Sequence, residues 1–431
     1  MIWNESKECM SREQMHDLQS KRLRKLVSTV YHNTPFYRRK MQEMDITPDD
    51  IRSIDDIVKL PFTTKQDLRD NYPFGLQAVP TSEIVRIHAS SGTTGNPTIV
   101  GYTRHDLEIW QESIARCLTA YGITRNDIFS VGYGYGLFTG GLGAHYGAEY
   151  VGATVIPTST GNTEKHVRLI RDLGITGIAC TPSYALYLAE TIEKMGIDPQ
   201  MLKLRVGMFG AEPWTENMRK EIESRLHLSA YNCYGLSEIM GPGVAHECEC
   251  KNGSHILEDH YYPEIISPET LQPLPFGQTG ELVFTTLTKE GMPLLRYRTK
   301  DLTSLIEGIC DCGRTNVRMT RIVGRSDDML IIRGINVFPS QVESVILDMP
   351  EFEPQYLLDR INNLDTLQVQ VEVRRDFFSD ELSAMLALKK RLADRLKSVL
   401  TVGADVKLME PNSIQRSEGK SKRVIDKRNI E

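Results

Sequence analysis

The chain has 431 residues, which exceeds the size at which a single hydrophobic core normally stops growing, so two or more domains are expected. Hydrophobic residues make up 40% and charged residues 25%, and the net charge of -6 gives no sign of nucleic-acid binding. The polar first residues do not resemble a signal peptide, and no stretch has the apolar continuity of a membrane span. We therefore expect a cytoplasmic protein that binds neither nucleic acid nor membrane.

The amino-terminal half predicts a helical start followed by an alternating α/β pattern. Residues 11–33 should form an amphipathic helix, because Ser11 and Gln14 match a capping box and apolar residues recur at helical spacing. From about residue 100 to residue 240, β-rich runs alternate with helical patterns, which predicts parallel strands with crossover helices. Within this region, the Gly- and Tyr-rich stretch from Ser130 to Ile156 is expected to form a loop or the wall of a pocket.

The pattern changes after Glu258, where strand-like pieces with turn signals predict a mixed or antiparallel sheet. The charged, turn-prone run from Arg325 to Asp328 is the candidate linker to a second domain. Beyond it, a hairpin, a helix, a strand, a long amphipathic helix and another strand predict a small α+β unit. The sequence thus predicts an α/β protein with one domain over residues 1–326 and a second over residues 327–431.

Residues 88–101 read HASSGTTGNPTIVG, a composition suited to holding an anion. Glycine allows successive backbone N–H groups to converge on one phosphate, and the hydroxyl groups add donors. The stretch is not a Walker A loop, because Gly95 is followed by Asn96 instead of lysine, so a catalytic cation must come from elsewhere. A flexible surface turn is the alternative. The candidate phosphate-binding residues are Ser90, Ser91, Gly92, Thr93, Thr94 and Gly95.

Two C-x-C pairs stand apart from the scattered cysteines. The segments HECECKNGSH and GICDCGRT lie about sixty residues apart, and soft ligands of this kind favour a structural zinc site with four Cys or His ligands. The alternative is a set of unligated thiols. The candidate ligands are His246, Cys248, Cys250, His255, Cys310 and Cys312.

Five further stretches follow the Gly/Ser/Thr loop in order: GAEPWTENMRKEI at 210–222, YNCYGLSEI at 231–239, YRTKDL at 297–302, RIVGRSDDMLIIRG at 321–334 and SEGKSKR at 417–423. Together they resemble the adenylate-forming superfamily, which activates carboxylic acids with ATP. The segments EDHYYPEII and SDDMLIIRGINVFPSQVE are similar in sequence to the phenylacetate-CoA ligase family. The resemblance implies a large N-terminal adenylate-forming domain with parallel and mixed sheets and a small mobile C-terminal α+β domain.

The resemblance also implies roles for individual residues. It places a Mg2+-binding carboxylate at Glu238, a ribose-binding carboxylate at Asp301, an arginine near the nucleotide phosphates at Arg325 and a hinge at Asp327. An ordinary strand and turn is the alternative for the remaining nucleotide motifs. These comprise Gly210, Ala211 and Glu212 on the adenine side, and Asn232, Cys233, Tyr234 and Gly235 along the nucleotide and acyl pocket.

The missing cation is assigned by the same resemblance to Lys420, which follows Gly419 and would reach between the attacking carboxylate and the α-phosphate. A solvated charge run is the alternative reading of this basic tail. Lys422 lies nearby, so the choice between the two lysines stays open.

For the carboxylic acid, Tyr135 and Phe138 are candidates to bind an aryl side chain, although aromatic residues in this position can also be plain core. Among the candidate zinc ligands, the family resemblance favours Cys248, His255, Cys310 and Cys312, with Cys250 as the substitute.

The resemblance therefore implies a ligase that activates an aromatic, phenylacetate-like carboxylic acid. It would form an acyl-adenylate from ATP with Mg2+, release pyrophosphate and then make the coenzyme A thioester with release of AMP. One alternative is a related adenylating enzyme with another acceptor, similar to synthetases that adenylate a deazaflavin coenzyme. The other is a non-catalytic nucleotide-binding regulatory protein with a structural zinc. The name of the acid and the existence of a homodimer stay open.

Overall fold

The computed structural model describes residues 1–90, 97–326, 330–332, 335–361, 366–379, 381–416 and 423–426. The chain divides into two compact units. The first unit comprises residues 1–180, 201–211 and 229–321, and the second comprises residues 181–200, 212–228 and 322–431. Because two segments from the middle of the chain belong to the second unit, the single boundary after residue 326 stays a prediction.

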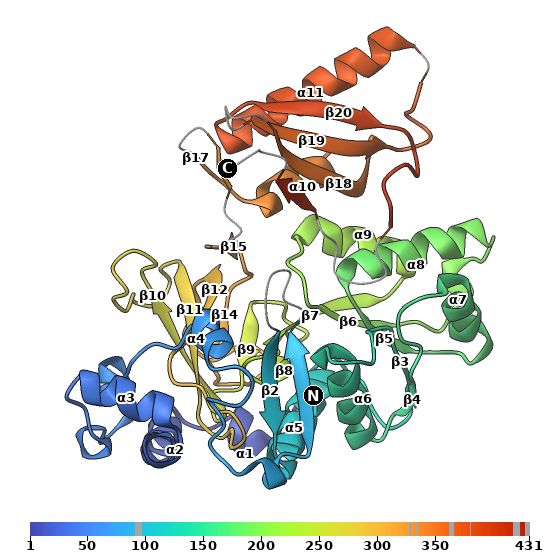
Figure 1. Cartoon of the computed structure of the whole chain (residues 1–431). Helices are drawn as coiled ribbons and strands as arrows, with labels where there is room; N and C mark the ends of the chain where they lie inside the picture. The colour runs from blue at the N-terminus through green and yellow to red at the C-terminus, as the bar shows by residue number, and fades with distance from the viewer. Residues whose placement is uncertain are drawn as a thin grey trace. The chain divides into compact units, whose positions relative to one another are not determined.

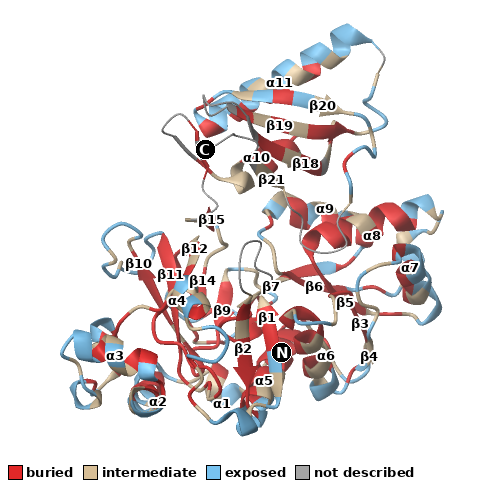
Figure 2. Cartoon of the chain, viewed as in Figure 1, coloured by how far each residue is buried: buried red, intermediate tan, exposed pale blue. Residues whose placement is uncertain are grey.

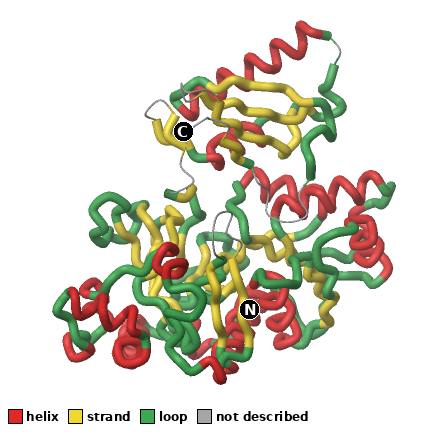
Figure 3. The backbone as a smooth tube through the Cα atoms, viewed as in Figure 1, coloured by secondary structure: helices red, strands yellow, loops and turns green. Residues whose placement is uncertain are grey.

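The first unit is built on a large mixed sheet, seen in Figures 1 and 3. Its strand order is β13-β14-β9-β8-β7-β6-β5-β3-β4, and neighbouring strands from β4 through β7 are parallel. This confirms the predicted parallel strands with crossover helices. The bounds are β3 (Ile128–Val131), β4 (Thr154–Ile156), β5 (Gly177–Cys180), β6 (Val206–Gly210), β7 (Ser229–Leu236), β8 (Gly241–His246), β9 (Ser254–Ile256), β13 (Leu305–Ile306) and β14 (Arg318–Met319).

Strands β5 and β6 are buried at every position, as expected for parallel strands covered on both faces, and they appear red in Figure 2. The helices α5 (Arg104–Ala120), α6 (Thr139–Val151) and α7 (Thr163–Asp172) belong to this part of the chain. None of the helices that the structure describes combines the length and apolar character needed to cross a membrane.

The stretch from Ser130 to Ile156 was expected to form a loop or the wall of a pocket, and the loop alternative is wrong for residues 139–151, which form helix α6. Two glycines of this helix serve close packing. A Cβ atom at Gly143 would lie 2.5 Å from the Trp110 ring, and one at Gly147 would lie 2.1 Å from Ile114. Both partners lie on helix α5, so the glycine content reflects helix–helix contact and not an irregular backbone.

Further strands of the first unit pair antiparallel, which confirms the predicted change of pattern after Glu258. Strands β1 (Arg86–Ser90) and β2 (Thr98–Tyr102) form a hairpin, whereas β10 (Tyr261–Ile266), β11 (Gly280–Thr286) and β12 (Tyr297–Thr303) lie side by side in that order.

The amino-terminal helices are α1 (Glu5–Glu8), α2 (Arg12–Asn33), α3 (Pro35–Glu43) and α4 (Lys65–Asp70), and the capping box of Ser11 and Gln14 at the start of α2 is present. Helix α2 is tied to the segment before β10. The Arg12 guanidinium donates to both carboxylate oxygens of the buried Glu258, at 2.7 and 2.8 Å, and Gln19 donates to the Glu258 carbonyl at 3.0 Å.

The second unit has an α+β fold, as predicted for the carboxyl-terminal part. Its sheet has the order β20-β19-β18-β21, with β18 and β19 antiparallel, and the hairpin of β16 and β17 is also confirmed. The bounds are α8 (Pro182–Lys194), α9 (Glu216–Leu226), β15 (Gly324–Arg325), β16 (Leu330–Ile332), β17 (Ile335–Val337), α10 (Pro339–Leu347), β18 (Phe352–Ile361), β19 (Thr366–Val373), α11 (Leu382–Leu400), β20 (Ala404–Met409) and β21 (Val424–Asp426).

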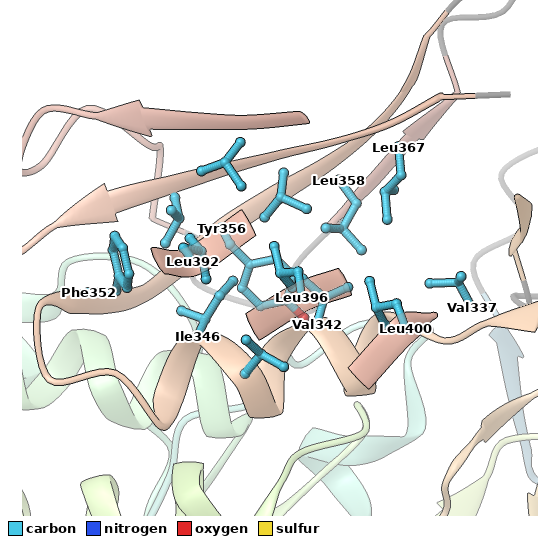
Figure 4. Close-up of a cluster of buried hydrophobic side chains, with 14 of the residues drawn as sticks. Val337, Val342, Ile346, Phe352, Tyr356, Leu358, Leu367, Leu392, Leu396 and Leu400 are labelled. Carbon is cyan, nitrogen blue, oxygen red and sulfur yellow. The ribbon is translucent and has the colours of Figure 1, made fainter. Parts of the chain in front are cut away.

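An apolar core holds helices α10 and α11 to this sheet (Figure 4). Leu392, Leu396 and Leu400 of α11 recur at intervals of four residues and are buried together with Ile346 of α10 and Phe352 of β18. The spacing places the leucines on one face of α11, which explains why this amphipathic helix was predictable.

Candidate functional site

The predicted nucleotide motifs meet at one edge of the large sheet. Strands β3, β6 and β7 belong to its parallel part, and the aromatic stretch 133–138, the residues after Gly210 and the turn containing Glu238 each follow the carboxyl end of one of them. In open α/β sheets this edge is where ligands bind. The topology therefore gathers segments that lie about one hundred residues apart in the sequence.

The Gly/Ser/Thr loop begins at Ser90, the last residue of β1, while Ser91, Gly92, Thr93, Thr94 and Gly95 lie outside the described residues. The hydroxyl oxygen of Ser90 is buried and has no hydrogen-bond partner among the residues the structure describes. The backbone N–H of Ala89 donates to the Leu137 carbonyl at 2.9 Å. The start of the loop is thus attached directly to the aromatic stretch, and an unpaired buried hydroxyl there suits an anionic ligand.

Gly210 and Gly235 are required by the spacing of neighbouring strands. A Cβ atom at Gly210 would lie 2.2 Å from the carbonyl oxygen of Cys233, its partner in the sheet. One at Gly235 would lie 1.9 Å from the carbonyl oxygen of Gly241. The next residue, Ala211, has a φ of 71°, a left-handed conformation that is uncommon for alanine and clusters at functional sites.

Tyr234 and Asp301 join the large sheet to strand β12. The Tyr234 hydroxyl donates to the Asp301 carboxylate at 2.6 Å, and only 6% of Asp301 is exposed. Asn232 and Cys233 precede Tyr234 on β7, and the backbone N–H of Asn232 donates to Glu247 at 2.7 Å. A carboxylate held at this position has the chemistry to accept hydrogen bonds from the hydroxyl groups of a ribose.

Glu238 lies in the turn Ser237–Met240, which joins β7 to β8. Its side chain is buried, and the Lys65 ammonium on α4 lies 3.5 Å from one of its carboxylate oxygens. Tyr102 and Lys289 contact the backbone of the same turn. A buried carboxylate at the sheet edge has the chemistry that Mg2+ prefers.

The aromatic stretch contains two kinds of side chain. Tyr133 is buried and donates to the Cys180 carbonyl at 2.7 Å, so it is part of the core. Tyr135 and Phe138 are half-buried. The Tyr135 hydroxyl lies 3.1 Å from His145 Nδ1, and burial raises the pKa of this tyrosine. The side chain of His145 in turn contacts Glu149 at 3.1 Å.

Other predicted site residues belong to the second unit or lie outside the described residues. Glu212 accepts a hydrogen bond from the backbone N–H of Ser183, at the start of helix α8, at 2.8 Å. Arg325 is half-buried on β15. Asp327, Lys420 and Lys422 lie outside the described residues.

Two arginines stand on either side of residues 417–422. Arg416 bridges two carboxylates, donating to Glu190 on α8 at 3.0 Å and to Glu372 on β19 at 2.7 Å. Arg423 donates to the Ser183 hydroxyl at 3.1 Å. Helix α8 therefore contacts the chain both before and after the stretch that contains Lys420.

The second candidate site is the cysteine and histidine cluster, which lies in the first unit. The structure brings together Cys248, His255, Cys310 and Cys312, whose ligand atoms all lie within 4.8 Å of one another. This is the set favoured at the sequence level, and neither His246 nor Cys250 is part of it.

The spacing within the cluster matches tetrahedral zinc. Cys248 Sγ and Cys310 Sγ are 3.8 Å apart, and Cys312 Sγ and His255 Nε2 are 3.5 Å apart. A tetrahedron with Zn–S bonds of about 2.3 Å and a Zn–N bond of about 2.0 Å has edges of about 3.8 and 3.5 Å. The four side chains can therefore hold zinc with little rearrangement.

The protonation equilibria of His255 and Cys310 suit a metal, whereas that of Cys248 opposes one. Burial, with Arg314 and Arg318 nearby, lowers the pKa of His255 to about 3, so the imidazole is neutral at pH 7 and can act as a ligand. Burial would raise the pKa of Cys310, but hydrogen bonds from the Cys312 backbone and from neighbouring thiols lower it below the usual value. Burial raises the pKa of Cys248.

No sequence motif contains Tyr102, Lys289 or Lys65. Each is a single residue of a common type at the edge of a strand or helix pattern, and its position beside Glu238 depends on contacts fifty or more residues away in the chain. From the sequence, Tyr102 at the end of an apolar strand would be assigned to the core, with no indication of its contact with the turn.

Two family models match the chain. Residues 9–287 match the AMP-binding enzyme family, and residues 334–428 match the AMP-binding enzyme C-terminal domain. A solved 2-hydroxyisobutyryl-CoA ligase, in the postadenylation state in complex with R3-HIB-AMP, is similar over 98% of this chain and 91% of its own, with 29% identity and a TM-score of 0.92.

Two curated relatives are similar to this chain over nearly its whole length. The phenylacetate-coenzyme A ligase of Escherichia coli K12 is 53% identical, over 98% of this chain and 97% of its own. That of Thermus thermophilus is 50% identical, over 99% of this chain and 100% of its own. At this similarity the protein is an AMP-forming acid–thiol ligase, which joins a carboxylic acid to coenzyme A through an acyl-adenylate. The chain belongs to the phenylacetate-coenzyme A ligase family of adenylate-forming enzymes.

Proposed function

We propose that the physiological substrate is an aromatic carboxylic acid of the phenylacetate type. The observation that carries this proposal is the position of Tyr135 and Phe138, half-buried after strand β3 in the stretch whose Leu137 carbonyl binds the start of the phosphate loop. Aromatic side chains there would bind an aryl group beside the nucleotide phosphates. The names of the relatives from E. coli and T. thermophilus support the same substrate class.

The acid preference is tested by a panel of carboxylic acids in an assay of coenzyme A-dependent AMP formation. Burying a ring instead of a methyl group should favour an arylacetic acid over acetate by about 1 to 3 kcal/mol. A Tyr135→Ala variant should lose much of that preference, while a variant of the exposed Leu137, Leu137→Ala, serves as a control in the same stretch. Higher efficiency with acetate or a long-chain fatty acid than with every aryl acid would overturn the proposal.

For the nucleotide, we assign the triphosphate to the loop of residues 90–95, the ribose hydroxyl groups to Asp301 and the adenine side to residues 210–212. Glu238 would hold a Mg2+ ion, which would neutralise charge on the phosphate oxygens. The carboxylate of the acid is the nucleophile at the α-phosphorus, so the chain's task in this step is to hold two anions together and exclude water.

Lys420 is proposed to supply the cation between the two anions, and rotation of the C-terminal domain about Asp327 would separate adenylation from thioester formation. Lys420→Ala should then slow acyl-adenylate formation by about 10²-fold or more, measured by pyrophosphate exchange. Given a preformed acyl-adenylate, the variant should make the thioester at nearly the parental rate. Equal losses in both half-reactions would contradict the assignment, and no loss in either would move the role to Lys422.

We also propose that the cysteine and histidine cluster holds one structural zinc ion. The matched edge lengths described above support it. The double variant Cys310→Ser with Cys312→Ser should abolish zinc binding. It should also lower the melting temperature, because the bound zinc would join segments about sixty residues apart. Cys250→Ser, which changes a thiol outside the group of four, should keep the metal. Elemental analysis that finds no zinc in the parental protein would refute this proposal.

A further inference from the structure

We propose that Lys289 and Tyr102 are positioning residues for the Glu238 carboxylate, acting by holding the backbone of the turn Ser237–Met240. This inference rests on the proposed role of Glu238 in binding Mg2+. It adds a function for two buried side chains, which would act through the backbone of that turn.

The turn has four consecutive carbonyl groups, and two side chains bind all of them. The Tyr102 hydroxyl lies 3.2 Å from the Ser237 carbonyl oxygen and 2.8 Å from that of Met240. The Lys289 ammonium donates to the carbonyl oxygens of Glu238 and Ile239, at 3.0 and 2.8 Å. Each of these carbonyl oxygens thus has a side-chain donor within 3.2 Å, which restricts the direction in which the Glu238 side chain leaves the backbone.

Lys289 is an unusual residue for a purely structural contact. Only 3% of it is exposed, and among the described residues it forms no ion pair. Its ammonium lies 5.0 Å from the centre of the Tyr102 ring. Burying a lysine without a carboxylate partner is costly, so a hydrophobic residue would have been the better choice for stability alone.

The surroundings of the two side chains are rigid. The Tyr102 ring stacks on Trp110 of helix α5, with centroids 5.2 Å apart and planes 15° from parallel. The Ser237 hydroxyl is 2.9 Å from the Thr139 hydroxyl at the start of α6. A carboxylate held by a preorganised backbone binds a cation more tightly than a free one, and loss of such supporting contacts typically costs about 10- to 100-fold in metal affinity or activity.

The test measures how strongly Mg2+ promotes ATP binding, by isothermal titration calorimetry of the full-length protein. Lys289→Met keeps the length and apolar stem of the side chain but removes the donors. We expect the Mg2+ concentration for half-maximal ATP binding to rise about 10-fold, and the Mg2+ concentration for half-maximal pyrophosphate exchange to rise in parallel. Lys59→Met, a lysine paired with Asp56 on the surface, is the matched control and should leave both values unchanged.

The variant Glu238→Gln distinguishes the proposed Mg2+ role of Glu238 from the proposed positioning role of Lys289 and Tyr102. If it leaves the Mg2+ dependence unchanged, the role of Glu238 fails and this inference fails with it. If Glu238→Gln raises the Mg2+ requirement while a folded Lys289→Met protein keeps the parental value, only the inference about Lys289 is overturned. Should Lys289→Met not fold, Tyr102→Phe, which removes a single hydroxyl group, decides: a raised Mg2+ requirement supports the inference, and an unchanged one overturns it.

Discussion

Lys289 and Arg296 lie seven residues apart and are both buried cations, yet their partners differ. Each has an aromatic neighbour: the Arg296 guanidinium lies 4.0 Å from the centre of the Phe62 ring, and Lys289 lies over Tyr102. Each also donates to two backbone carbonyls. Within the described part of the chain, only Arg296 also pairs with a carboxylate, since it forms two hydrogen bonds with Glu264 at 3.1 and 2.8 Å.

The difference shows that buried charge serves two purposes in the first unit. Arg296 joins the segment 58–60 and strand β10 to the start of strand β12, so its contacts fasten parts of the fold. Lys289 holds one turn, and that turn carries a candidate metal ligand. Changes at Arg296 should therefore appear mainly in stability, and changes at Lys289 mainly in Mg2+ dependence.

The largest expected effect is on Arg296. Arg296→Leu should reduce the free energy of unfolding by about 3 to 5 kcal/mol, because it leaves the buried Glu264 carboxylate without its partner. Burial already raises the pKa of Glu264 although Arg296 opposes the shift. Denaturant unfolding measures the loss.

A double variant checks the reason for that loss. Arg296→Leu with Glu264→Leu removes both charges, so it should be more stable than Arg296→Leu alone. If the double variant is the less stable of the two, the cost comes from lost packing and carbonyl contacts instead of from the unpaired carboxylate, and the contrast with Lys289 weakens.

Arg296 and Lys289 are buried as charged groups, whereas the buried titratable side chain of His166 is kept neutral. Its Nε2 atom lies 2.8 Å from the Ser130 hydroxyl, and burial lowers its pKa from 6.5 to about 4. Because the unfolded chain binds the proton more readily, stability from this group is lost as pH falls from 6.5 through 4, by up to about 3 kcal/mol. His166→Gln should therefore show a shallower fall in stability over this range.

Unfolding measured at several pH values between 4 and 7 gives the slope. His105→Gln, at an exposed histidine on helix α5, is the control and should keep the parental slope. A parental slope in His166→Gln as well would mean that His166 does not titrate differently in the folded protein.

The smallest expected effect concerns the aromatic partner of Arg296. Phe62→Leu keeps most of the apolar contact but removes the ring face, so the free energy of unfolding should fall by about 0.5 to 1 kcal/mol. Thermal or urea unfolding measures it. A loss as large as that of Arg296→Leu would assign the main stabilisation of the guanidinium to the ring and not to Glu264.

Much of the fold was predictable because local pattern and tertiary structure agree. The Ser11 cap and the four-residue leucine spacing of α11 are signals within one element, and the β/α alternation before residue 240 follows the order of elements along the chain. Helix α6 was missed because its glycines, read locally, indicate a loop, whereas Trp110 and Ile114 on α5 require them.

The candidate site was predictable where residues come in motifs. The four-residue cysteine and histidine group was chosen from six candidates with the help of a family resemblance, and the structure brings those four together. Lys289 could not be found this way, because a single lysine in the stretch TLTKEG looks like part of a polar turn. Its burial depends on the turn Ser237–Met240, fifty residues earlier.

The close approach of carbonyl oxygens to Gly210 and Gly235 has a consequence for mutational scanning. Replacement of either glycine by alanine would push neighbouring strands apart, since the added methyl group would meet backbone atoms at 2.2 or 1.9 Å. An alanine scan would score both positions as essential for ATP use, although neither variant would have lost a group that touches the nucleotide. Loss of activity in an alanine variant at Gly210 or Gly235 therefore reflects disturbed packing of the sheet. Contacts with the ligand are tested by substitutions at side chains such as Asp301.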